Sequence, residues 1–112
     1  WDEIRFLTGG HAIEGKTVYF HDAWRKAGRA APHPGEPPGC TWSNRNRFAR
    51  LALEPDRRID YVFTGYPTGQ GLGLVERCEV ACDEVVGGVW PSDHFGVYAE
   101  LRTEPLPEAY FH

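Results

Sequence analysis

Two segments of the sequence place ionisable side chains within or beside apolar runs. Asp60 stands within the alternating run 59–63, and Asp93 and His94 come directly before a second alternating run, 95–102. A carboxylate within a strand is costly to bury unless it is paired or binds a cation. A histidine is a natural partner, because a carboxylate that accepts one ring N–H fixes the tautomer and makes the other nitrogen more basic. We therefore expect Asp60 and His94 to touch, with the second ring nitrogen of His94 facing a substrate.

Asp93 is expected to serve a different task from His94. Side chains of adjacent residues on extended backbone point to opposite sides, so these two cannot share one target. Asp93 is then suited to holding a divalent cation, and the alternative is a cap on the polar loop 91–94. For Asp60 and His94 the alternative is a buried structural pair in a β domain, because structural ion-pair networks contain the same groups.

The two segments together resemble a known family. The run RIDYVF at 58–63 and the run PSDHFGV at 91–97, in this order and at this spacing, are similar to the C-terminal half of the endonuclease/exonuclease/phosphatase superfamily. These are the deoxyribonuclease I-like and exonuclease III-like metal-dependent phosphoesterases. The match covers residues 40–102. The resemblance implies a four-layer α/β/β/α sandwich that hydrolyses phosphodiester or phosphomonoester bonds with Mg²⁺ or Mn²⁺.

The resemblance also implies roles for individual residues. It makes His94 the catalytic histidine, acting as general base or phosphate ligand, and Asp60 the carboxylate that orients it. Asp93 becomes the acidic residue at or near the metal. The segment that lines the substrate cleft in the family corresponds to three further residues here: Thr41, Trp42 and Asn44. The implied partners are phosphate esters, either nucleic acid, a nucleotide, or a phospholipid or inositol phosphate.

Residues 45–58 are locally basic, with five arginines against two acidic residues, although the whole chain has a net charge of -4. Arginine geometry suits contacts with phosphate groups, so we assign Arg45 to substrate binding as well. The alternative for this segment is a solvated loop. The acidic total excludes a chain that wraps nucleic acid through its net charge.

Parts of the family pattern are absent from the 112 residues. The Gly-Asp-x-Asn motif and the N-terminal half with its glutamate metal ligand do not occur, and the chain contains no Met. We therefore expect a single partial domain over 1–112 that binds its metal weakly or not at all and is inactive alone. Its expected partner is the missing N-terminal half or a second copy, since a half sandwich leaves strand edges unpaired. The alternative function is a truncated, non-catalytic module that binds a ligand or self-associates.

The cysteines favour a structural role. Three Cys cannot close a disulfide framework, which predicts a reducing, bacterial-like cytoplasm. On one strand Cys78 and Cys82 would lie about 13 Å apart, too far for one disulfide or one zinc ion. We expect both to be small buried hydrophobes on one face, with Val80 between them. A zinc module that uses both thiols and a His is the alternative. No apolar run reaches the ~18 residues of a membrane span.

Local patterns predict short helices first and strands afterwards, which favours an α+β fold of mainly antiparallel strands. Helical spacing and end signals predict two helices, at 2–8 and 20–27. Alternation and composition predict four strands, at 40–43, 59–63, 74–82 and 95–102. The predicted connections are a Pro- and Gly-rich loop over 29–39, a glycine-rich hairpin turn over 67–73 and a peripheral tail over 103–112.

Overall fold

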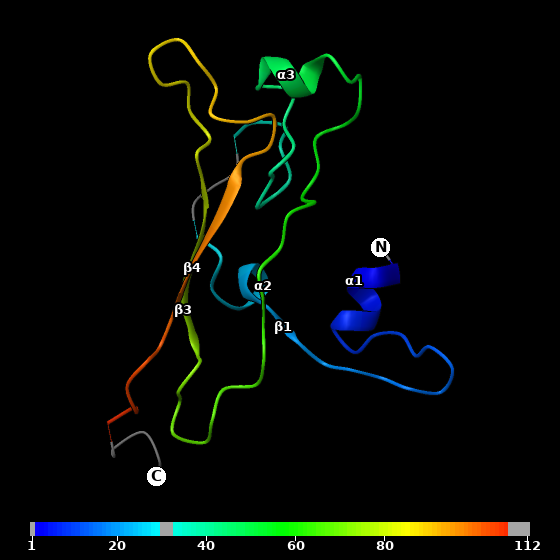
Figure 1. Cartoon of the computed structure of the whole chain (residues 1–112), viewed down its shortest axis with the longest axis vertical. Coiled ribbons are helices and arrows are strands. Elements are labelled where there is room, and N and C mark those ends of the chain that lie inside the picture. The colour runs from blue at the N-terminus through cyan, green and yellow to red at the C-terminus, as the bar shows by residue number, and fades with distance from the viewer. Residues whose placement is uncertain (1, 30–32, 108–112) are drawn as a thin grey trace.

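Short helices and two small sheets follow one another along the chain (Figure 1). The computed structural model describes residues 2–29 and 33–107. The elements in chain order are α1 (Asp2–Leu7), β1 (His21–Asp22), α2 (Ala23–Ala27), α3 (Arg47–Arg50), β2 (Phe63–Thr64), β3 (Val75–Ala81) and β4 (Gly96–Leu101). Parts of the predicted loop 29–39 and of the predicted tail 103–112 lie outside the described residues.

The two predicted helices are confirmed, and local capping explains their ends. Asp22 precedes α2, and its Oδ1 accepts the backbone N–H of Trp24 at 3.1 Å. This is the hydrogen bond that an N-cap residue supplies. The N–H of Gly28 donates to the carbonyl of Trp24 at 2.7 Å and closes the helix. The predicted start of the second helix at residue 20 is wrong, because residues 21 and 22 form β1, which pairs with β2.

Both sheets are two-stranded and antiparallel. β1 pairs with β2, and β3 pairs with β4 from Val75 opposite Leu101 to Ala81 opposite Gly96. The strand predictions for 74–82 and 95–102 are therefore confirmed. The glycine-rich segment 67–73 is a turn, but the hairpin prediction for it is wrong, because the strands that it joins belong to different sheets.

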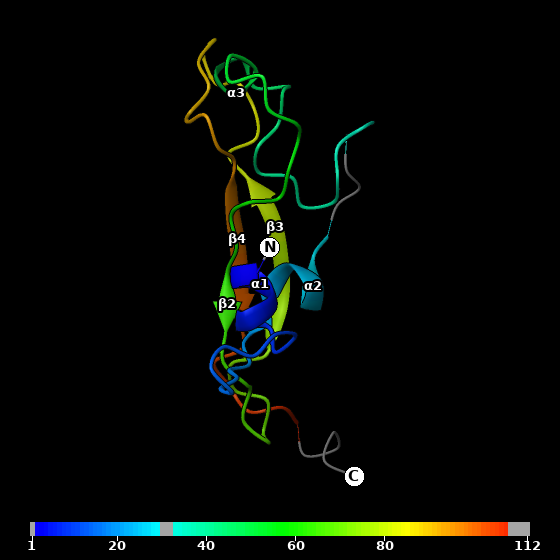
Figure 2. The same cartoon turned by 90° about the vertical axis from the view of Figure 1, so that its right-hand side faces the viewer.

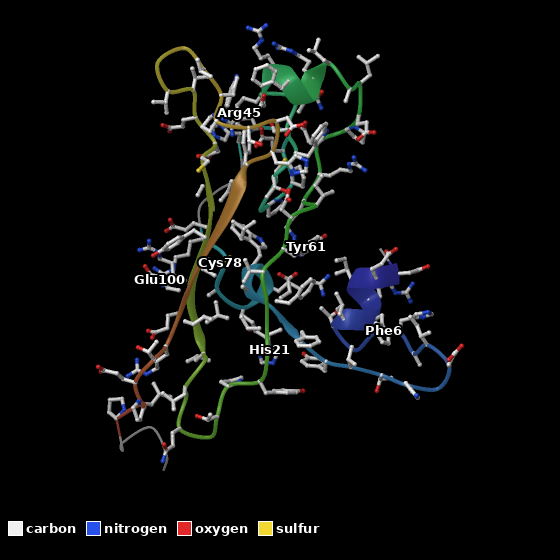
Figure 3. The ribbon with its side chains drawn as sticks, in the orientation of Figure 1. Phe6, His21, Arg45, Tyr61, Cys78 and Glu100 are labelled. Atoms are coloured by element: carbon white, nitrogen blue, oxygen red, sulfur yellow. The ribbon has the colours of Figure 1, made fainter. Side chains whose placement is uncertain are left out.

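The apolar core lies where α2 packs on one face of the β3–β4 hairpin. Ala23, Val75 and Cys78 are its buried members. In Figure 3, Cys78 lies on the side of the hairpin that faces α2, and Glu100 lies on the opposite side. The hairpin therefore has one face that packs against α2 and one face that does not. The burial of Cys78 was predicted and is confirmed.

The chain is a small α+β domain with two antiparallel sheets and a few short helices. Its Cα radius of gyration is 16.8 Å, whereas a compact domain of this length has about 13 Å. Figure 2 shows the reason: β3 and β4 form a long narrow ribbon, with loops extending beyond both ends. The extents of 51 × 39 × 21 Å describe this flat, elongated shape. Among the described residues, no helix is long and apolar enough to cross a membrane.

The strand predictions for 40–43 and 59–63 are wrong, because the backbone groups of these segments do not form a continuous ladder with a neighbouring strand. Residues 40–43 make one isolated bridge, between Trp42 and Arg57, and no strand. In the run 59–63 only Phe63 is in a strand. The N–H groups at 59 and 60 donate to the hydroxyl of Thr41, so they are not free for a ladder. Asp60 therefore lies on extended backbone outside any sheet.

The prediction for Cys82 is also wrong. β3 ends at Ala81, and Cys82 adopts a left-handed φ of 56° with its side chain exposed. Cys78 faces the core, so the two thiols do not share a face. Within 2–29 and 33–107, no three His, Cys, Asp or Glu side chains group as metal ligands, which leaves the zinc alternative without a site there.

A buried ion pair joins α2 to the segment that carries Asp60. Arg58 donates to both carboxylate oxygens of Asp22, at 3.0 and 2.6 Å, and Asp22 is only 3% exposed. The guanidinium of Arg58 also lies 4.3 Å from the ring centroid of Tyr61. A buried charge left without its partner is strongly destabilising. The pair therefore fixes Arg58, and with it the start of the segment that leads to Asp60.

We expect Asp22→Ala to lower the free energy of unfolding by about 3 kcal/mol. The substitution leaves the buried Arg58 charge without its carboxylate partner and removes the N-cap of α2. Asp22→Asn keeps a capping oxygen and should lose less. The matched control is Glu54→Ala, which breaks the exposed Glu54–Arg57 pair and should cost under about 1 kcal/mol. Urea unfolding followed by circular dichroism measures all three, and equal losses for Asp22→Ala and Glu54→Ala would contradict the assignment.

The three thiols should differ in reactivity. Burial raises the pKa of Cys40 to about 11, and the charges of Glu36 and Asp56 act in the same direction. Burial, followed by the charge of Asp22, also raises the pKa of Cys78. The thiolate is the nucleophile, so at pH 8 only about one Cys40 thiol in a thousand is reactive.

Iodoacetamide at pH 8 should therefore modify the exposed Cys82 first, as read by peptide mass spectrometry of the folded chain. Cys82→Ser should remove the fast phase of modification. Raising the pH from 8 towards 11 should accelerate the modification of Cys40, because its thiolate fraction grows over that range. Fast labelling of Cys40 at pH 8 would show that this thiol is not desolvated.

Candidate functional site

Asp60 and His94 form a hydrogen-bonded pair across 34 residues of sequence. The Nδ1 atom of His94 lies 2.7 Å from Oδ2 of Asp60, and both side chains are 39% exposed. Because the carboxylate accepts the Nδ1 proton, the neutral ring carries its lone pair on Nε2. Among the described residues, Nε2 has no hydrogen-bond partner. The predicted contact is confirmed, and it leaves the second nitrogen of a partly exposed ring able to accept a proton or, when protonated, to bind an anion.

Thr41 holds the two backbones that carry this pair. Its side chain is fully buried, and its Oγ1 accepts the N–H groups of Ile59 at 3.2 Å and Asp60 at 3.1 Å. Its carbonyl accepts the N–H of Phe95 at 2.7 Å. One residue thus ties the backbone of Asp60 to the residue that follows His94. The sequence assigned Thr41 to a substrate cleft, but the structure places its side chain against main chain.

Trp42 restrains the imidazole ring. The ring centroids of Trp42 and His94 are 5.0 Å apart at an interplanar angle of 75°, an edge-to-face contact. Such pairs are favourable because the positive edge of one ring meets the negative face of the other. Trp42 is 9% exposed, and its Nε1 is buried with no hydrogen-bond partner among residues 2–29 and 33–107. His94 is therefore held by a carboxylate at Nδ1 and by an indole at its ring.

Asn46 positions the loop before His94, and sequence reasoning missed it. Its Nδ2 donates to the carbonyl of Ser92 at 2.6 Å, and its Oδ1 accepts the N–H of Phe48 at 2.9 Å as the N-cap of α3. The side chain is fully buried. An asparagine two residues before a Phe-Ala-Arg run is a capping signal, but nothing local indicates its bond to residue 92.

Asn44 and Arg45, assigned to substrate from the sequence, make bonds within the chain. Asn44 donates its N–H and its Nδ2 to Asp56, at 2.7 and 2.9 Å. Arg45 donates to Glu36 at 3.2 Å and to the carbonyl of Asp83 at 2.7 Å. Both side chains thereby brace loops around the dyad. Their contact with a substrate stays a prediction.

The basic character of 45–58 is largely neutralised by neighbouring acids. Arg45, Arg57 and Arg58 each pair with a carboxylate. Arg47 lies over the ring of Phe48, 5.5 Å from its centroid, and no ion pair is made by Arg50 within the part of the chain that the structure describes. Only two of the five arginines therefore keep a free charge.

Asp93 is exposed and lies beside Ser92, whose hydroxyl donates to Asp93 Oδ1 at 3.2 Å. The N–H of His94 approaches the same hydroxyl at 3.2 Å, so Ser92 and Asp93 also order the turn. Mg²⁺ and Mn²⁺ need several oxygen ligands. The residues present do not fit such an ion, because Asp60 is bonded to His94 and no three candidate ligands group together within the described ranges.

Comparison with known proteins adds no independent assignment. No protein-family model matches the chain, and no curated protein or solved structure is detectably similar to it. What the site can do is therefore argued from its geometry: an ordered, half-exposed imidazole with a carboxylate behind it.

The constraint imposed by Thr41 gives a direct prediction. Thr41→Val keeps the shape of the side chain but leaves the N–H groups of residues 59 and 60 without an acceptor, which should destabilise the fold by about 2 kcal/mol. It should also weaken the Asp60–His94 hydrogen bond, seen as loss or upfield movement of the His94 Nδ1–H proton resonance. Thr41→Ser keeps the hydroxyl and should retain that resonance.

The matched control for Thr41→Val is Thr68→Val. The exposed hydroxyl of Thr68 accepts one backbone N–H, from Leu72 at 3.1 Å. Its loss should cost about 0.5 kcal/mol or less, because water can replace it, and should leave the His94 resonance in place. An unchanged Nδ1–H resonance in a folded Thr41→Val chain would show that Thr41 does not position the pair.

Proposed function

We propose that this chain carries the histidine–carboxylate dyad of a phosphoester hydrolase of the endonuclease/exonuclease/phosphatase type, and that its fold is the C-terminal half of the four-layer sandwich of that family. In this proposal His94 is the catalytic residue and Asp60 orients it. The substrate is a phosphodiester or phosphomonoester. The observation that carries the proposal is the 2.7 Å contact between His94 and Asp60, which leaves Nε2 available.

The chemistry of the pair suits proton transfer at a phosphate. A neutral imidazole whose Nδ1–H is held by a carboxylate can take a proton from water at Nε2, and the carboxylate stabilises the resulting imidazolium. In the protonated state the same Nε2–H can donate to a phosphate oxygen. Thr41 and Trp42 limit the motion of the pair, which favours one ring orientation over many.

Hydrolysis also needs groups that stabilise the charge on the phosphate and the leaving oxygen. The described residues supply the dyad and the exposed Asp93, but no cluster that fits Mg²⁺ or Mn²⁺. We therefore expect the 112-residue chain by itself to show no substantial turnover. The second candidate function, a non-catalytic module that binds a phosphate-bearing ligand, is favoured by this same observation.

Binding of inorganic phosphate tests the dyad directly. Titration of phosphate into the ¹⁵N-labelled chain at pH 6 should shift the His94 ring resonances, because Nε2–H donates to the anion. His94→Asn should abolish the effect, and Asp60→Asn should weaken binding about tenfold, as loss of an orienting partner does at comparable sites. His11→Asn, at an exposed histidine elsewhere, is the control and should change nothing. No shift at His94 would overturn both candidate functions.

Turnover tests whether the chain is an enzyme without further residues. With MnCl₂ and bis(p-nitrophenyl) phosphate, the chain alone should hydrolyse substrate no faster than His94→Asn does. Metal-dependent turnover that disappears in His94→Asn would instead establish that the chain is a sufficient enzyme and would rule out the non-catalytic module. Phosphate binding without turnover is the outcome that we expect.

A further inference from the structure

Three aromatic rings gather at the surface around β1 and β2. The ring centroids of Tyr19 and Tyr66 are 5.2 Å apart at an interplanar angle of 17°, so these two rings stack. His21 meets both edge to face, 5.5 Å from Tyr19 and 4.9 Å from Tyr66. Tyr66 is 69% exposed and Tyr19 45%, so the rings are not part of the core. We call these three rings the aromatic platform, and Figure 3 labels its His21 on β1.

Strand pairing brings the rings of the platform together. His21 lies opposite Thr64 in the antiparallel ladder of β1 and β2, and residues directly opposite each other share one face of a sheet. Tyr19 and Tyr66 each stand two residues outside that pair along their own segments. Two residues is the spacing at which side chains return to the same face of a strand. Residues more than 40 positions apart in the sequence therefore form one surface.

The ring of Tyr19 is held by the chain that follows α1. The N–H of Phe20 donates to the carbonyl of Leu7 at 2.7 Å and fixes the backbone beside Tyr19. Gly9 has a φ of 83°, and a Cβ atom there would lie 2.5 Å from Cδ2 of Tyr19. The ring thus occupies space that only glycine leaves open. The platform is formed before any ligand arrives.

A small cleft adjoins the platform. Its volume is about 130 Å³, and it is lined by two rings of the platform, Tyr19 and His21, and by the charged side chains Asp22, Arg25 and Lys26. Sites that enclose a whole drug-sized ligand measure about 300–1,000 Å³. The cleft therefore suits a small group such as one phosphate, while a ring attached to that group would lie outside it on the platform.

Positive charge exceeds negative charge at this cleft. Its one acid among the described residues is Asp22, and Arg58 donates to both oxygens of that carboxylate. Arg25 is exposed, with its Nε 3.7 Å from the same carboxylate. Lys26 is exposed and makes no ion pair within 2–29 and 33–107. Burial lowers the pKa of His21, and the charge of Lys26 lowers it further, so this ammonium group lies close to the platform.

The segments around the cleft do not cancel this charge. Residues 8–29 contain four Lys or Arg against two Asp or Glu, and residues 63–73 contain no charged side chain. In α1, Asp2 lies 3.9 Å from Arg5, and Glu3 lines a different cleft. The segment after β4 runs away from β1 (Figure 1). The platform therefore stands beside a cleft with an excess of positive charge.

We propose that the aromatic platform and its cleft bind an unpaired nucleotide of a single-stranded nucleic acid, with the base on Tyr66 and phosphates at Arg25 and Lys26. Bases stack on aromatic side chains whatever their sequence, because every base has a π-face, and Lys and Arg contact phosphates. A neutral sugar would use the rings without the cations, and inorganic phosphate would use the cations without the rings. Neither His94 nor Asp60 takes part, so this binding is independent of the proposed function.

Fluorescence anisotropy of a labelled twelve-nucleotide oligo(dT), titrated with the full 112-residue chain, tests the site. The single strand should bind, whereas thymidine monophosphate and a duplex of the same length should compete about tenfold less well or worse, because one offers a single phosphate and the other buries its base faces. With two phosphate contacts, raising NaCl from about 50 to 200 mM should weaken binding about sevenfold. Lys26→Gln removes one contact and should reduce that factor to about threefold.

Substitutions at Tyr66 test the stacking. Tyr66→Leu should weaken binding about tenfold, because it keeps an apolar side chain but removes the flat ring. Tyr66→Phe keeps the ring and should bind the oligonucleotide as the unaltered chain does. Circular dichroism should show that both variants are folded, since this side chain is largely exposed.

The matched control is Tyr98→Leu. Tyr98 is 45% exposed and has the guanidinium of Arg77 5.3 Å from its ring centroid, but its hydroxyl donates to Glu100 on the far face of the hairpin. This variant should bind the oligonucleotide as the unaltered chain does. Absence of binding, equal losses in Tyr66→Leu and Tyr98→Leu, or equal competition by the duplex or by thymidine monophosphate would overturn the proposal.

Discussion

Three hydrogen bonds to one buried threonine organise the candidate site. The hydroxyl of Thr41 accepts the N–H groups of residues 59 and 60, and its carbonyl accepts the N–H of Phe95. Backbone N–H groups must find acceptors when they are removed from water. Thr41 supplies those acceptors where a strand neighbour would otherwise be needed. The chain can therefore bring Asp60 to His94 without placing either residue in a sheet.

Buried polar side chains lie around the dyad beside the buried Trp42 and Phe95. Thr41, Ser43 and Asn46 are fully buried, and each makes hydrogen bonds to main chain or to a charged partner. Such networks specify one geometry because every alternative leaves a buried group unpaired. These bonds fix the geometry of the pair. They do not provide a binding site for an anion, because three arginines nearby form ion pairs with acidic side chains of the same chain. The site is thus an ordered imidazole–carboxylate pair with few groups beside it that could bind a charged ligand.

The small core of this chain leaves many apolar side chains exposed to solvent. The apolar core is small, centred on Ala23, Val75 and Cys78, and the hairpin extends well beyond it. Segments past the core are held by hydrogen bonds, such as that from Arg45 to the carbonyl of Asp83, and by separate buried side chains such as Trp42 and Phe95. These bonds brace loops without burying every side chain, so Leu53 and Val86 stay in contact with solvent. The loop that carries Val86 also leads to His94.

The sequence by itself determined the short-range structure and the chemistry of the dyad. The helix end at Gly28, the strands over 74–82 and 95–102, and the attraction between Asp60 and His94 all follow from local pattern and from the cost of burying charge. Only the tertiary structure decided that Asp60 lies outside a sheet, that Cys82 faces solvent and that Asn46 holds the carbonyl of Ser92. Those outcomes depend on contacts between residues far apart in the chain. The periodicity of apolar residues does not indicate which distant carbonyl or hydroxyl group a given polar group will bond.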